Sequence, residues 1–251
     1  MLTSPERLTK RQKRKLRQDK VLDKSGNLNV GERFKLNSIK PITIAQQDAF
    51  HSWHNDYHLM LHGIAGTGKT FIGLYLALKS VLEDKSFNKV FVIRSVVPTR
   101  DMGFLPGNQK EKMKVYEAPY QDIARKLFNR GDAYEILKTK NIVEFMSTSF
   151  VRGITLDDCV IIVDEVQNMN AMELHSVMTR VGENCRIIFC GDVRQDDLTS
   201  ERKKELSGLR EFLRIIDSME EFDFIEFTAE DIVRSDLVKS YIIARSKLGL
   251  D

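Results

Sequence analysis

Residues 63–70 (GIAGTGKT) restrict the possible folds of this chain more than any other stretch. They match G-x-x-x-x-G-K-[ST] at every fixed position, the pattern of a loop that wraps the phosphates of a nucleoside triphosphate. Glycines permit backbone torsions closed to other residues, so the loop's N–H groups can converge on phosphate oxygens at a helix N-terminus. We expect a nucleoside triphosphate to be held by this whole loop, namely Gly63, Ile64, Ala65, Gly66, Thr67, Gly68, Lys69 and Thr70.

Two residues of the loop have more specific expected roles. Lys69 would bridge the β- and γ-phosphates, and the Thr70 hydroxyl would ligate Mg²⁺. A glycine-rich turn could match the pattern by chance. The context argues against chance, because residues 57–62 (YHLMLH) have the pattern of a short apolar strand and residues 70–81 (TFIGLYLALKSV) that of a helix.

A second candidate site segment follows the most apolar strand. Residues 159–164 (CVIIVD) form a continuous apolar run, typical of a strand buried on both faces of a parallel sheet. The run ends in Asp164 and Glu165, where strand-end carboxylates complete a Mg²⁺ site beside a phosphate loop. We expect Asp164 to hold the metal, and Glu165 to orient or deprotonate the attacking water. Beyond the next apolar strand, residues 186–190, Gln195 could contact the γ-phosphate or the lytic water.

The remaining pattern alternates strands and helices. This predicts an α/β fold, a doubly wound and mainly parallel sheet of the RecA-like P-loop NTPase type, with nucleotide at the carboxyl edge. Further strands are expected at residues 89–93, 141–146 and 222–227, and further helices at 118–128, 171–181, 205–216 and 236–248. A helix from about Ile44, capped by Thr43, would place Gln46 or Gln47 in its first turn. Either amide could read adenine or simply lie on the surface.

The N-terminal region differs in composition from the rest. Residues 7–24 hold nine Lys or Arg against two Asp, so we expect residues 1–38 to be a flexible basic arm and residues 39–251 to be the folded domain that carries the phosphate loop. The arm could neutralise nucleic-acid phosphates or only aid solubility, since the whole chain's formal charge is just +3. Three cysteines without metal spacing favour a reducing cytoplasm, and no apolar run is long enough for a membrane span.

The ordered motifs resemble the PhoH family of P-loop ATPases, relatives of superfamily 1 helicase cores. The resemblance runs from Pro41 nearly to the C-terminus. It rests on the loop at 63–70, residues 103–107 (GFLPG) with 118–122 (APYQD), residues 150–156 (FVRGITL), residues 164–168 (DEVQN), residues 179–182 (TRVG), residues 191–198 (GDVRQDDL), residues 207–209 (SGL) and residues 231–234 (DIVR). Departures from the usual pattern are Ile64, Ser95 and Val151.

This resemblance implies several roles. Gln46 rather than Gln47 would read adenine, Gln195 would sense the γ-phosphate, and Arg234 is the first candidate for an arginine that neutralises transition-state charge. Arg152 and Arg94 are the alternatives for that arginine, and each could instead be an ordinary salt-bridge residue.

The expected activity is Mg²⁺-dependent ATP hydrolysis coupled to RNA or single-stranded DNA, with Arg180, Arg152 and the basic arm as candidate phosphate contacts. Related helicases place nucleotide between two RecA-like domains, whereas this sequence has length for one. We therefore expect a homo-oligomer, a hexameric ring with an arginine acting in trans. The alternative is an ATP-dependent switch acting on a protein partner. A small-molecule kinase is less well supported, because no substrate lid is recognisable.

Overall fold

The structure is a computed structural model that describes residues 34–96, 109–192 and 207–248. The chain divides into two units, Met1–Lys35 and Leu36–Asp251, and every element below belongs to the second. Residues 1–33 of the predicted basic arm, the GFLPG segment and Gln195 lie outside the described residues.

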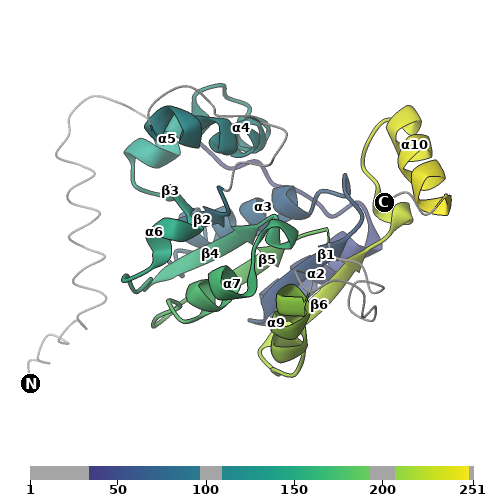
Figure 1. Cartoon of the computed structure of the whole chain (residues 1–251). Helices are drawn as coiled ribbons and strands as arrows, with labels where there is room; N and C mark the ends of the chain where they lie inside the picture. Colours follow the sequence, from purple (N-terminus) through teal and green to yellow (C-terminus); the bar gives the residue numbers. More distant parts are fainter. Residues whose placement is uncertain (1–33, 97–108, 193–206, 249–251) are drawn as a thin grey trace, which may run out of the picture. The chain divides into compact units, whose positions relative to one another are not determined.

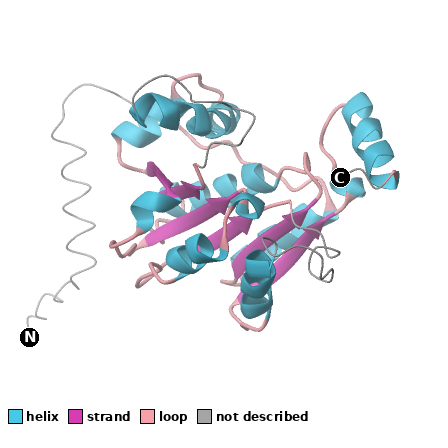
Figure 2. Cartoon of the chain, in the orientation of Figure 1, coloured by secondary structure: helices cyan, strands magenta, loops and turns pink. Residues whose placement is uncertain are grey.

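Six strands form one sheet in the order β3-β2-β4-β5-β1-β6, and each neighbouring pair is parallel (Figures 1 and 2). This confirms the predicted RecA-like α/β architecture, with all six expected strands in place. The strands are β1 (His58–Gly63), β2 (Lys89–Arg94), β3 (Val143–Ser147), β4 (Cys159–Asp164), β5 (Arg186–Cys190) and β6 (Phe222–Phe227).

Helices cover both faces of this sheet (Figure 1). The α-helices of the described residues are α2 (Ile44–His54), α3 (Lys69–Leu82), α4 (Gln109–Phe128), α5 (Ala133–Thr139), α6 (Thr148–Val151), α7 (Ala171–Met178), α9 (Ser207–Asp217) and α10 (Asp236–Lys247). Two single 3₁₀ turns, η1 (Val166–Asn168) and η2 (Ala229–Asp231), follow β4 and β6. None of these helices is long and apolar enough to cross a membrane.

Two helices differ from their predicted bounds by more than two residues. α7 ends at Met178 rather than at residue 181, and α4 begins at Gln109 although the sequence predicted a start at residue 118. Proline usually sits in a first turn, yet Pro119 lies inside α4. The lost backbone hydrogen bond is offset by tertiary packing, because Tyr120, Ala124 and Leu127 on this helix are completely buried.

The side chains of β4 point alternately to the two faces of the sheet, and this places the carboxylate of the site. Cys159, Ile161 and Val163 belong to an apolar cluster with residues of α7 and α9. Because side chains alternate along a strand, Asp164 points to the opposite face, where α3 packs against β4. The carboxylate at the end of β4 therefore faces the helix that follows the phosphate loop.

Candidate nucleotide-binding site

The phosphate loop joins β1 to α3 and depends on three glycines with left-handed backbone torsions. Gly63, Gly66 and Gly68 have φ values of +108°, +81° and +91°, and Gly68 is the N-cap of α3. At Gly63 a side chain is also excluded by space, because an added Cβ would lie 2.2 Å from the carbonyl oxygen of Phe227 in β6. The Thr67 hydroxyl donates to the Ile64 carbonyl oxygen at 2.9 Å. These features hold the curved loop that a phosphate cradle requires.

Lys69 lies inside this loop. Its Nζ donates hydrogen bonds to the carbonyl oxygens of Gly63 at 2.7 Å and Ile64 at 2.8 Å. Burial lowers the pKa of Lys69, and nearby acidic groups, foremost Asp192, oppose that shift. A buried ammonium held at the loop has the placement needed to meet a phosphate anion.

Thr70 and Asp164 come together across the site. The Thr70 hydroxyl donates to Asp164 Oδ1 at 2.8 Å. Asp164 is only 4% exposed, and burial raises its pKa, against the lowering effect of hydrogen bonds from Tyr120 and Thr70. A hydroxyl and a carboxylate are hard oxygen ligands of the kind Mg²⁺ prefers. Since Mg²⁺ usually keeps waters and substrate phosphates in its shell, these two residues fit the ion.

Glu165 has a strained left-handed backbone, with φ of 56°. Its carboxylate accepts a hydrogen bond from the Gln167 amide nitrogen. The Gln167 oxygen in turn accepts from the Asp192 backbone N–H at 3.0 Å. Gln167 thus ties Glu165 at the end of β4 to Asp192 after β5. The sequence marked residue 167 only as part of a motif, and its linking role depends on the neighbouring strand.

Gln46 and Gln47 have different surroundings. Thr43 caps α2, as predicted, by accepting from the Gln46 N–H at 3.3 Å. Gln46 is buried, and its amide nitrogen donates to the Thr67 carbonyl at 3.4 Å while its oxygen accepts from the Ile42 N–H at 3.0 Å. Gln47 is exposed. An amide has capacity for one further bond on each side, so Gln46 can join the loop to a ligand.

The segment after η2 lies on the phosphate loop of its own chain. The Val233 N–H donates to the Gly66 carbonyl at 3.2 Å. A Cβ added at Gly66 would lie 3.2 Å from Arg234 Cγ and 3.6 Å from Ile242 Cδ1 of α10. Arg234 itself is exposed. The sequence predicted Arg234 near a nucleotide but did not indicate that this contact is with its own loop.

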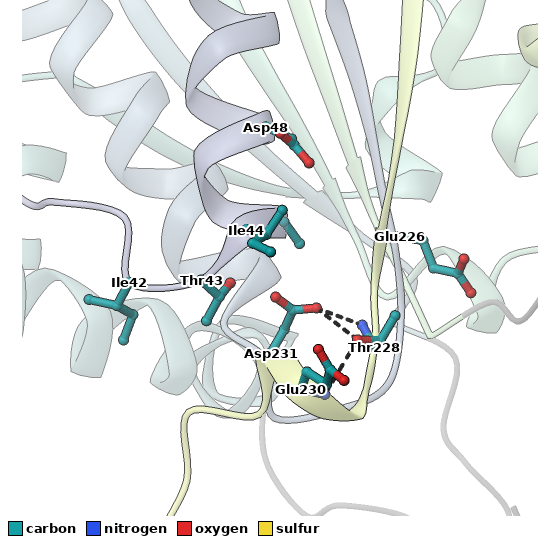
Figure 3. Close-up of a pocket in the computed structure, with 9 residues that line it drawn as sticks. Ile42, Thr43, Ile44, Asp48, Glu226, Thr228, Glu230 and Asp231 are labelled. Atoms are coloured by element: carbon teal, nitrogen blue, oxygen red, sulfur yellow. Dashed lines mark hydrogen bonds between the residues drawn. The ribbon is translucent and has the colours of Figure 1, made fainter.

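Asp231 holds that segment against α2. Its Oδ2 accepts from the Thr228 N–H at 2.9 Å and from the Thr228 hydroxyl at 3.1 Å (Figure 3). Burial alone would raise the pKa of Asp231, but hydrogen bonds from Thr43, Thr228 and the Ala45 backbone lower it overall. A pocket of about 390 Å³ lies around this junction, and its lining includes Asp48, Glu226 and Glu230. Figure 3 shows Asp231 between Thr228 and the first turn of α2.

The other candidate arginines lie in different places. Arg94 ends β2 in register with Asp164, and its guanidinium lies 5.9 Å from the Tyr116 ring centre. Arg152 is the exposed C-cap of α6. Arg180 is half-buried just after α7. Gln195 lies outside the described residues, so its role stays a prediction.

Comparison with known proteins identifies the family. The family model for PhoH-like proteins matches residues 38–245. A PhoH-like protein of Bacillus subtilis (strain 168) is 33% identical over 219 residues, which is 87% of this chain and 67% of that protein. Protein PhoH of Escherichia coli (strain K12) is 34% identical over 186 residues, covering 73% of this chain and 51% of its own length.

A similar solved structure is the large terminase from the thermophilic bacteriophage D6E. It has a TM-score of 0.47 at 14% identity and covers 80% of this chain and 50% of the terminase. The family model spans the sheet and the phosphate loop described above. The chain therefore belongs to the family of PhoH-like proteins.

Proposed function

We propose that this chain binds ATP with Mg²⁺ and hydrolyses it. The observation that carries the proposal is the contact of the Thr70 hydroxyl with Asp164 Oδ1, 2.8 Å apart, next to a loop whose lysine is already directed inward. A bound Mg²⁺ would neutralise charge that develops on the phosphates. Thr70 and Asp164 would hold the ion, and Lys69 would contact the β- and γ-phosphates.

The remaining roles are proposed from position or from the resemblance. Glu165 is proposed to orient or deprotonate the attacking water, since its carboxylate lies one residue beyond the proposed metal ligand. Gln46 is proposed to contact adenine, because it already links the loop to the segment before α2. Gln195 is proposed to sense the γ-phosphate, on the resemblance alone.

Arg234 is proposed to act within its own subunit, because its side chain lies against Gly66 of the same chain. An arginine that acts in trans has to reach away from its own loop. Of the three candidates, Arg152 is exposed at the end of α6 and Arg94 lies beside Asp164. We therefore propose Arg152 as the arginine that reaches a neighbouring subunit's nucleotide, where such a contact can raise the rate about 10³–10⁵-fold.

A ring of identical subunits, a hexamer, is proposed to complete the site. Support comes from α10, which approaches the loop at Ile242 yet has no buried residue among those described. Leu237 and Tyr241, one turn apart on α10, are 81% and 65% exposed. A 12-residue helix is marginal without packing, so its exposed apolar side chains favour a partner. Light scattering that detects only monomer, with and without ATP and Mg²⁺, would refute the ring.

Turnover is tested by changing the loop lysine. Lys69→Ala should abolish ATP hydrolysis measured by phosphate release, whereas Lys79→Ala on the same helix α3 should retain it. Glu165→Gln should bind nucleotide normally and hydrolyse it at least 100-fold more slowly, as is typical when a general base is lost. Wild-type turnover by Glu165→Gln would show that another group serves the water.

Coupling to RNA or single-stranded DNA is part of the proposal. The sequence support is the basic arm, together with Arg180 as a candidate phosphate contact. Single-stranded RNA should stimulate hydrolysis, and the stimulation should fall steeply with salt because phosphate contacts release counterions. Indifference to RNA and DNA would instead favour an ATP-dependent switch, for which the exposed face of α10 offers a protein-binding surface.

A reducing cytoplasm is the proposed location, consistent with three free cysteines and testable by cell fractionation.

A further inference from the structure

Tyr120 reaches the site from outside the nucleotide-binding motifs. It lies on α4, between β2 and β3 in the chain, and its side chain is completely buried. Its hydroxyl donates to Asp164 Oδ2 at 2.8 Å. The other oxygen of the same carboxylate, Oδ1, accepts from Thr70. The two oxygens of Asp164 therefore have separate partners, one on α3 and one on α4.

The direction of the hydrogen bond between Tyr120 and Asp164 follows from the chemistry of the two groups. An ionised carboxylate can only accept hydrogen bonds, so the Tyr120 hydroxyl is the donor and Asp164 Oδ2 is the acceptor. Arg94 lies on the neighbouring strand β2, in register with Asp164. Tyr116, one turn earlier on α4, supports the Arg94 guanidinium with its ring face.

The consequence concerns the orientation of the carboxylate. An aspartate held at both oxygens cannot rotate about its last torsion, so Oδ1 remains on the side of Thr70. Oxygen ligands held by outer hydrogen bonds bind metal more tightly, and loss of such a partner typically costs 10- to 100-fold in metal affinity. The hydroxyl of Tyr120 makes no contact with the phosphate loop among the described interactions, so its effect has to pass through Asp164.

We propose that Tyr120 is a positioning residue that presents Asp164 to the metal that accompanies the nucleotide, and so couples helix α4 to the nucleotide site. The proposal rests on the proposed function, since it concerns the same metal. It assigns α4 a role in setting the affinity of the site for Mg²⁺.

The test compares Tyr120→Phe with wild type and with Tyr116→Phe as the matched control. Tyr120→Phe removes one hydroxyl and keeps the buried ring, whereas Tyr116→Phe removes a hydroxyl from the same helix without touching Asp164. A fluorescent ATP analogue is titrated in EDTA and then at rising Mg²⁺. The Mg²⁺ dependence of phosphate release is measured in parallel, and urea unfolding checks that each variant folds.

The expected result for Tyr120→Phe is a rise of about tenfold in half-saturating Mg²⁺, with unchanged analogue affinity in EDTA and kcat largely recovered at saturating Mg²⁺. Tyr116→Phe should match wild type. Wild-type Mg²⁺ dependence in Tyr120→Phe would overturn the proposal. An equal loss of affinity with and without Mg²⁺ would also overturn it, because that pattern indicates a general packing role.

Failure of the proposed function would give a different experimental result from failure of the inference about Tyr120. If the wild-type chain shows neither analogue binding nor any Mg²⁺ effect, the assignment of an ATPase site fails, and the inference about Tyr120 fails with it. If wild type binds and responds to Mg²⁺ while Tyr120→Phe responds identically, only the inference fails.

Discussion

The change Gly63→Ala tests the close approach of the phosphate loop to β6. Gly63 pairs with Phe227 at the end of the β1–β6 ladder, and the next residue, Ile64, donates its N–H to the Phe227 carbonyl at 2.9 Å. An alanine Cβ would lie 2.2 Å from that carbonyl oxygen and 2.9 Å from the Phe227 nitrogen. Both are backbone atoms, so no side-chain rotation can relieve the contact.

Two separate energetic costs give the expected loss of stability in Gly63→Ala. A backbone φ of +108° strains an alanine by about 1–3 kcal/mol. Moving β6 away breaks the hydrogen bond between Ile64 and Phe227, which costs about 0.5–1.5 kcal/mol net. We therefore expect Gly63→Ala to lower the free energy of unfolding by about 3 kcal/mol, equivalent to a Tm decrease of about 6–12 °C in a domain of this size.

Two other glycines separate these contributions. Gly153 has a φ of +84° with nothing within 4 Å of an added Cβ, so Gly153→Ala should cost only the strain, about 1–2 kcal/mol. Gly131 has open space and no positive φ, so Gly131→Ala should leave stability unchanged or slightly raised. Urea unfolding of the three variants measures the series. A Gly63→Ala variant as stable as Gly153→Ala would refute the steric argument.

Two further predictions concern buried charges. Asp231→Asn should destabilise the fold by about 1–2 kcal/mol at pH 7, as loss of a helix cap does. The lowered pKa of Asp231 means that this contribution is present above the ordinary aspartate pKa and is lost as pH falls through the lowered one. The difference from wild type in urea unfolding should thus shrink below about pH 4, and a constant difference would show that the charge of the Asp231 carboxylate does not matter. Arg186→Met should cost about 3 kcal/mol, because the guanidinium lies 3.4 Å from the Trp53 ring centre and donates to the Tyr57 carbonyl at 2.6 Å. Arg214→Met, at an exposed position on α9, is the control and should unfold like wild type.

Local sequence was sufficient for much of the fold. All six strands were predicted, because buried parallel strands are continuous apolar runs bounded by polar residues. The start of α2 at Ile44 was predicted for a local reason as well, since an N-cap needs only Thr43 and the N–H groups that follow it. The predicted start of α4 at residue 118 was wrong, because the helix runs through Pro119 from Gln109, and burial of Tyr120, Ala124 and Leu127 stabilises it.

The sequence by itself determined the phosphate loop, since glycine spacing and one lysine specify a backbone shape that needs few distant partners. It also placed Asp164 at the end of a buried strand. Only the tertiary structure decided which groups meet there, because contacts between residues far apart depend on strand order and on the face each side chain takes. Tyr120 on Asp164, Gln167 between two strand ends and Arg234 on its own chain's Gly66 are contacts of that kind. Spacing along the chain does not encode such contacts; packing of α4 and of the segment after β6 onto the sheet creates them.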